Sequence, residues 1–142
     1  MRRLLLVIAL IAVSFGTGFA QKSAKKAPSP KRRIVVAFYD DGRLRDAAGQ
    51  AKLQDFRYFL KTIQEIAKKD FPDVEFKVVG RGELVKLPDY TNINVETMQP
   101  PLGFALVQTG TKRRILTGVQ TDSDFACAAA AYFKRSSSAC PK

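Results

Sequence analysis

The chain has 142 residues, 46% of them hydrophobic, which is enough for one folded domain and its core but not for two. It contains no histidine, which excludes Ser-His-Asp and Cys-His catalysis, histidine general bases, and zinc or copper sites built from histidine. The formal net charge is +11, but residues 34–142 carry 16 basic and 13 acidic residues, so most of the excess lies near the N-terminus.

The first twenty residues have the three-part layout of a secretory signal peptide. The basic start Met1–Arg3 precedes an unbroken apolar run, Leu4–Val13, and the small residues Gly18 and Ala20 stand at positions −3 and −1 of a cut after Ala20. Because about 18 apolar residues are needed to span a bilayer, we expect cleavage and a secreted or periplasmic protein. The alternative is a retained membrane anchor, since the basic residues that follow tend to stay on the cytoplasmic side.

Residues 21–33 form a basic, proline-containing tail without acidic residues. We interpret this tail first as a solvated linker. The alternative is attachment to anionic lipid, cell-wall polymer or another polyanion, for which the candidate residues are Lys22, Lys25, Lys26, Lys31, Arg32 and Arg33. Nucleic acid is not expected as a partner, because exported proteins rarely meet it and the domain lacks interleaved basic and aromatic residues.

The domain is expected to cover residues 34–142 and to begin with a strand, a turn and a long helix. Arg33–Tyr39 is apolar on both faces after its first residue, which predicts a central strand covered on both sides. Asp40–Gly42 has turn chemistry. An apolar stripe predicts an amphipathic helix from about Asp46 to Lys69, and Pro72 prevents its continuation; the stripe consists of Leu53, Phe56, Leu60, Ile63 and Ala67.

A second strand and a segment of uncertain structure follow. Val74–Val78 alternates with charged residues, which predicts a strand with one more polar face. Gly80–Pro88 is expected to hold a short helix or strand, and Asp89–Pro101 has no firm periodicity, so we interpret it as an irregular connection. We expect any specific recognition surface in residues 80–101, because loops carry function more often than the elements they join.

The C-terminal part predicts a β-hairpin and a closing helix. Phe104–Gln108 and Arg114–Val119 flank a glycine-containing loop at residues 109–113. Thr121 can cap a helix that runs to Arg135, with Asp124 as the residue three positions on. A strand–helix–strand unit implies a parallel strand pair, so the fold class is α/β, with a mixed sheet and helices packed on its faces.

This order of elements, with Pro101 just before the third main strand, resembles the thioredoxin-like fold over residues 33–135. The resemblance implies a cis-proline at Pro101. Redox-active members carry Cys-x-x-Cys at the start of the long helix, where the helix dipole lowers a thiol pKa. Here Gly42–Ala47 contains no cysteine, so the redox activity of the family is not carried over.

Cys127 and Cys140 are the only two cysteines. In an exported chain an even number of cysteines favours a structural disulfide. The helix that follows Cys127 and the five residues before Cys140 are long enough for the chain to double back. The alternative is a redox-active pair, although no neighbouring motif indicates a reactive thiolate.

Charged and aromatic clusters are interpreted first as structural. Asp40–Asp41 suits a turn and Asp122 with Asp124 a helix N-terminus, although paired carboxylates can also bind Ca²⁺ or share a proton. Arg43 and Arg45 could meet an anion at the start of the long helix, but the neighbouring aspartates favour local ion pairs. The basic cluster of the domain either keeps a hairpin tip soluble or contacts a polyanion together with the tail; it consists of Lys112, Arg113 and Arg114. Six phenylalanines are assigned to the core: Phe56, Phe59, Phe76, Phe104, Phe125 and Phe133.

These observations favour an exported, non-catalytic binding or structural domain with no cofactor and no metal. Its expected partner is an envelope or extracellular protein, or an anionic surface reached through the tail. Two alternatives remain open: a divergent thiol–disulfide oxidoreductase that uses Cys127 and Cys140, and a polyanion or envelope tether that uses the basic N-terminal tail.

Overall fold

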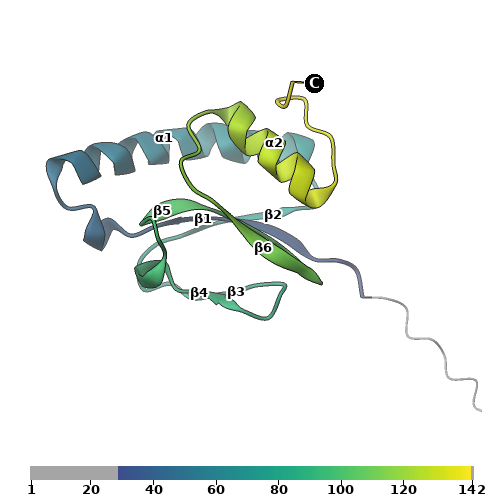
Figure 1. Cartoon of the computed structure of the whole chain (residues 1–142), viewed down its shortest axis with the longest axis horizontal. Coiled ribbons are helices and arrows are strands. Elements are labelled where there is room, and N and C mark those ends of the chain that lie inside the picture. The colour runs from purple at the N-terminus through teal and green to yellow at the C-terminus, as the bar shows by residue number, and fades with distance from the viewer. Residues whose placement is uncertain (1–28, 142) are drawn as a thin grey trace, which may run out of the picture.

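A four-stranded mixed sheet forms the centre of the fold in the computed structural model, which describes residues 29–141 (Figure 1). Its strands are β1 (Arg33–Tyr39), β2 (Glu75–Val79), β5 (Leu102–Gln108) and β6 (Thr111–Leu116), in the order β2-β1-β5-β6. β1 pairs with β2 in parallel, whereas the β1–β5 and β5–β6 pairs are antiparallel. The predicted parallel pair, mixed sheet and α/β class are therefore confirmed.

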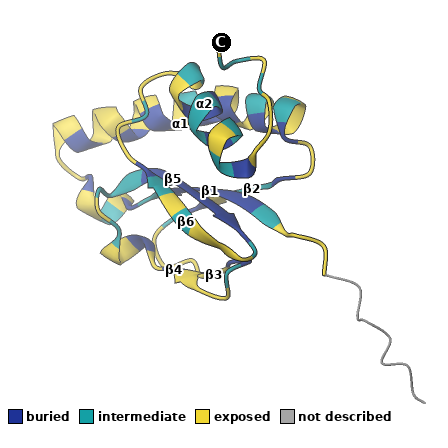
Figure 2. Ribbon diagram, turned by 45° about the vertical axis from the view of Figure 1, so that its right-hand side comes forward, coloured by how far each residue is buried: buried dark blue, intermediate teal, exposed yellow. Residues whose placement is uncertain are grey.

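Strand β1 is central because its side chains enter two different cores. Val35 and Ala37 pack on one face of the sheet, while Ile34, Val36 and Phe38 pack on the other. All five are fully buried, which explains why this strand is apolar on both faces in the sequence (Figure 2).

Both helices cover the same face of the sheet (Figure 1). Helix α1 (Ala47–Asp70) and helix α2 (Asp122–Phe133) enclose the larger core, and the apolar stripe predicted for α1 is the face that it buries. Four of the six phenylalanines assigned to the core are buried here, and Phe59 and Phe76 pack against them partly buried. The expectation that helices would cover more than one face is wrong for the described residues.

The second face of the sheet is covered by residues 80–101. This segment contains β3 (Val85–Lys86) and β4 (Asn92–Ile93), which pair with each other, and the short 3₁₀ helix η2 (Val95–Thr97). It buries isolated apolar residues against β1 and β5: Leu87, Ile93 and Val95. Three such residues without a regular spacing produce no periodic pattern, which explains why the sequence predicted only an irregular connection.

Two details of the strands differ from the sequence prediction. The β5–β6 connection is only Thr109–Gly110, with Gly110 at a φ of 75°, so Lys112 and Arg113 lie in strand β6 and not in a loop. β6 is an edge strand and can carry charged side chains along its length. On the other edge Val78 is 44% exposed, and Val79 fills the buried position of β2 instead.

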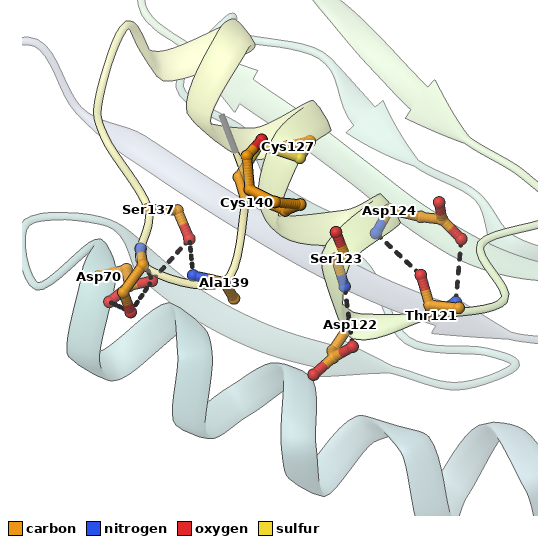
Figure 3. Close-up of a disulfide and its surroundings, with 11 residues drawn as sticks. Asp70, Thr121, Asp122, Ser123, Asp124, Cys127, Ser137, Ala139 and Cys140 are labelled. Atoms are coloured by element: carbon orange, nitrogen blue, oxygen red, sulfur yellow. Dashed lines mark hydrogen bonds between the residues drawn. A yellow bond between two sulfur atoms is a disulfide. The ribbon is translucent and has the colours of Figure 1, made fainter.

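Cys127 and Cys140 form a disulfide, with Cα atoms 4.8 Å apart, as predicted (Figure 3). The bridge joins α2 to the C-terminal segment 136–141. Ser137 and Ser138 in that segment donate hydrogen bonds to the Asp70 carboxylate at the end of α1. The segment is thus fixed to both helices.

Within residues 29–141, no helix is both long and apolar enough to cross a membrane. The predicted signal peptide and most of the basic tail, including Lys22, Lys25 and Lys26, lie outside the described residues.

Candidate functional site

An open groove of about 730 Å³ lies where three connections meet on the helix-covered side of the sheet. Its walls come from α1 together with Leu44, from the start of β5 with the two prolines before it, and from the β6–α2 connection. The lining is mostly apolar, with a few polar residues: Leu44, Lys52, Asp55, Phe56, Phe59, Pro100, Pro101, Leu102, Gly118, Val119 and Gln120. A concave, largely apolar site of this size is typical of a ligand or peptide site.

The first wall depends on a tight entry into α1. The chain passes from the 3₁₀ helix η1 (Asp41–Arg43) through Leu44 to Asp46, whose side chain accepts a hydrogen bond from the Gly49 N–H and caps α1. A Cβ atom on Gly49 would lie 2.8 Å from the Leu44 Cα, so only glycine allows the backbone to pack this closely. This packing holds Leu44 against the groove.

A buried carboxylate ties the second wall to the first. Asp40 is 1% exposed; its backbone N–H donates to the Pro101 carbonyl at 2.7 Å, and its side chain accepts from Arg43 Nε at 2.7 Å. Arg43 also donates to the carbonyls of Val95 and Met98, at 3.0 and 2.7 Å. Residues 95–101 are therefore held to the end of β1 by one ion pair and its hydrogen bonds.

The Asp40 carboxyl stays ionised in this setting. Burial by itself raises the pKa of Asp40, but the hydrogen bond from Arg43, the charges of Arg43 and Arg81, and the Gly42 N–H together lower it below the ordinary value of 3.8. The predicted local ion pair of Arg43 is confirmed, whereas Arg45 forms none within residues 29–141. The sequence did not indicate that Arg43 would also hold a segment more than fifty residues away.

The third wall is fixed by the start of α2. Thr121 caps the helix: its side chain accepts from the Asp124 N–H, and the Asp124 side chain accepts from the Thr121 N–H. The Thr121 hydroxyl and N–H lower the pKa of Asp124. The predicted capping role of this pair is confirmed, and it orients Gly118–Gln120 toward the groove.

Most of the groove lining is apolar. Its polar groups are one ammonium and one carboxylate on α1, from Lys52 and Asp55, and the amide of Gln120. The lining contains no thiol, hydroxyl or imidazole, so it holds no residue of the Ser-His or Cys-His type of nucleophile–base pair. Among residues 29–141 there is no group of three or more Cys, Asp or Glu side chains that could hold a metal ion.

Several candidate residues from the sequence lie elsewhere. Neither cysteine lines the groove. Arg32 and Arg33 are ion-paired with Glu75 and Asp73, whereas Lys31 is exposed. The basic cluster of Lys112, Arg113 and Arg114 lies on the edge strand β6, and the structure places it beside Arg32 through Thr109.

The proline prediction needs a correction. Pro101 lines the groove, but the cis peptide bond lies one residue earlier, at Gln99–Pro100. The Pro101 carbonyl is occupied by the Asp40 N–H at the point where β5 begins to pair with β1. The sequence offers two adjacent prolines and no signal that chooses between them.

Sequence reasoning also missed the groove itself. Phe56 and Phe59 were assigned only to the core, yet both line the groove, and Gly118–Gln120 carried no signal beyond their position before a helix cap.

No family model, no curated protein and no solved structure matches this chain.

Proposed function

We propose that this chain is an exported, non-catalytic binding domain of thioredoxin-like topology that holds an extended apolar segment of a partner protein in the groove. The observation that carries the proposal is the groove, in which three connections present apolar side chains around one concave site. The expected export makes an envelope or extracellular protein the natural class of partner.

The topology supports the finer part of this proposal. Strand order β2-β1-β5-β6, one parallel and two antiparallel pairs, and a strand–helix–strand unit followed by a hairpin and a helix are compatible with a thioredoxin-like fold. Such a fold serves many functions, so the site has to carry the functional argument.

The lining determines what the groove can bind. Pro100 and Pro101 have no backbone N–H to donate, and their rings are apolar. This wall of the groove therefore favours contact with apolar side chains. Each well-buried apolar side chain of a partner contributes about 1.5–3 kcal/mol. Part of this gain is lost in ordering the segment, so one short segment is expected to bind weakly.

The disulfide argues against the oxidoreductase alternative as the main function. Cys127 and Cys140 are bonded to each other on α2 and the C-terminal segment, both are partly buried, and neither contacts the groove. A substrate in the groove would not meet a sulfur atom. Reproducible turnover of a disulfide substrate by the purified protein would contradict the proposal.

The proposal is tested by selecting peptides and blocking the groove. Phage-displayed random 12-residue peptides are selected on the protein, and the winners are measured against Asp55→Trp, which places a large ring at the groove. The matched control is Glu65→Trp, the same kind of change at an exposed position of α1 outside the lining. We expect the selected peptides to contain apolar residues. Their affinity should be at least about tenfold lower for Asp55→Trp, which corresponds to about 1.4 kcal/mol of binding free energy, and unchanged for Glu65→Trp.

The opposite results are equally informative. Peptides that bind wild type and Asp55→Trp alike bind elsewhere on the molecule, and failure to enrich any sequence leaves the groove without a peptide ligand. Either outcome overturns the proposed function.

A further inference from the structure

The end of the sheet at which β1 begins brings together three segments that are far apart in sequence. Thr109 in the β5–β6 turn exchanges hydrogen bonds with Arg32, at 3.0 and 3.2 Å. Arg113 in β6 donates to Thr91 and to the Asn92 carbonyl, both at 3.4 Å, in the β3–β4 hairpin. The chain enters the sheet, β5 turns into β6, and the β3–β4 hairpin turns, all at this end (Figure 1).

This end carries unneutralised positive charge. We call it the basic end, and define it by Lys31, Lys86, Lys112 and Arg113. None of these four forms an ion pair within residues 29–141. The carboxylate of Asp89 lies in the β3–β4 turn and accepts hydrogen bonds from Thr91, and the four cations outnumber it.

An aromatic ring is displayed at the same place. Tyr90 is 94% exposed and lies in the turn of the β3–β4 hairpin with a φ of 63°. Glycine or asparagine adopts this left-handed conformation more easily than a bulky residue. The turn is closed by backbone hydrogen bonds between Leu87 and residues 90 and 91, so the tyrosine ring adds nothing to it.

We propose that the basic end docks on an anionic lipid bilayer, with its cations at the headgroup phosphates and the Tyr90 ring in the interfacial layer. Lysine and arginine near an anionic leaflet are attracted to it, and tyrosine is favoured at membrane interfaces because it joins an apolar ring to a polar tip. A soluble polyanion satisfies the charges but offers the ring no apolar phase. The ring therefore favours lipid over a soluble polyanion.

This inference does not depend on the groove. The groove lies beside the β5 start, where Leu102 pairs with Tyr39, whereas the basic end lies where Gln108 pairs with Arg33. The two sites are at opposite ends of β1, so a membrane-docked molecule keeps its groove turned away from the bilayer. One proposal can fail while the other holds.

The test uses the exported protein, whose N-terminus at Gln21 is verified by intact mass. Its binding is measured to vesicles of phosphatidylcholine alone and to vesicles that also contain about 30% phosphatidylglycerol, which gives them a strongly anionic surface. The first variant is Lys31→Gln/Lys86→Gln/Lys112→Gln, which removes three charged side chains that form no hydrogen bond or ion pair within residues 29–141 and leaves Arg113 in place. Its matched control is Lys61→Gln/Lys68→Gln/Lys69→Gln on the exposed side of α1.

We expect the protein to bind only to the anionic vesicles, and added salt to weaken this binding. The affinity of the basic-end variant should be about 100-fold lower than that of wild type, because each lost charge lowers it about fivefold. The α1 variant should bind nearly as wild type. Tyr90→Asn should bind about fivefold more weakly and yet be at least as stable as wild type, because asparagine tolerates the left-handed turn.

Three results overturn the inference. Equal losses in the two triple variants mean that only net charge matters. Unchanged vesicle binding in Tyr90→Asn removes the interfacial role of the ring. Equally tight binding to soluble polyphosphate, lost in the basic-end variant, assigns the surface to a soluble polyanion and not to lipid.

Discussion

Asp40 shows how one side chain holds a functional surface together. It lies at the end of β1, and its carboxylate and backbone N–H reach Arg43, Gly42 and Pro101. Arg81 adds a second, longer-range cation at 3.8 Å and pairs with Glu96 at 3.2 Å. A buried ion pair adds little to stability when compared with an apolar pair, but losing one partner is costly because the other charge stays without compensation.

We therefore expect Asp40→Asn to lower the free energy of unfolding at pH 7 by about 2 kcal/mol. Because the folded-state pKa of Asp40 is lowered, its contribution is complete above the ordinary value of 3.8 and disappears as the pH falls through the lowered folded value. The difference between wild type and variant should accordingly shrink below about pH 4. Urea unfolding across pH 2–8 (an interval spanning these values, roughly) measures this.

Asp41→Asn is the control for that series, since Asp41 is the exposed neighbour and no side-chain partner of it is found within the described residues. Its stability should match that of wild type. A pH-independent loss in Asp40→Asn, or an equal loss in both variants, would mean that the carboxylate charge is not what holds residues 95–101.

At the scale of elements, the C-terminal segment acts as a strap across both helices. The disulfide fixes it to α2, and the Asp70 carboxylate at the end of α1 accepts hydrogen bonds from Ser137 and Ser138 (Figure 3). The Ser137 hydroxyl is the main cause of the lowered pKa of Asp70, and it outweighs burial, which raises that pKa. The strap thus joins the C-terminal end of α1 to the middle of α2, two helices that already pack against each other.

Cys127→Ser/Cys140→Ser should lower the free energy of unfolding by about 3 kcal/mol, the value expected for a closed loop of about 15 residues. The sequence separation of the two cysteines is 13. The urea midpoint of the variant should fall, and wild type unfolded in excess reductant should fall to the same value. An unchanged midpoint in both experiments would show that the bridge does not stabilise the fold.

The elements also show which parts of the fold were predictable. β1 and the apolar stripe of α1 were found from the sequence because each has one dominant pattern: burial on both faces for β1, and a helical period for α1. The predicted β5–β6 loop, residues 109–113, extends too far toward the C-terminus. Lys112 and Arg113 are residue types typical of a loop, but an edge strand such as β6 also accommodates charged side chains. Residues 80–101 were beyond prediction because their three buried residues are held by contacts with β1 and β5.

At the scale of the whole molecule, the groove could not be predicted from the sequence. Its walls come from residues 44–59, 100–102 and 118–120, and only the folded sheet brings these segments together. The disulfide, by contrast, was predictable from cysteine number and helix length. The basic cluster was visible in the sequence, but its position beside Arg32 and the β3–β4 hairpin was not.

The intact mass of the protein exported from a host cell tests the proposed location. We expect a mass that begins at Gln21 and is two hydrogens short, with both cysteines alkylated only after denaturing reduction. An uncleaved N-terminus would place the domain at the membrane through its first segment, and readily alkylated cysteines would revive the oxidoreductase alternative.

The groove is the centre of the functional account, and backbone amide shifts of the isotope-labelled protein, titrated with a selected peptide, test it most directly. We predict that the largest shifts fall on Leu44, Phe56, Phe59 and Gly118–Gln120, and that Asp55→Trp abolishes them while Glu65→Trp does not. Shifts concentrated on β6 or the β3–β4 hairpin, or persisting in Asp55→Trp, would contradict the account.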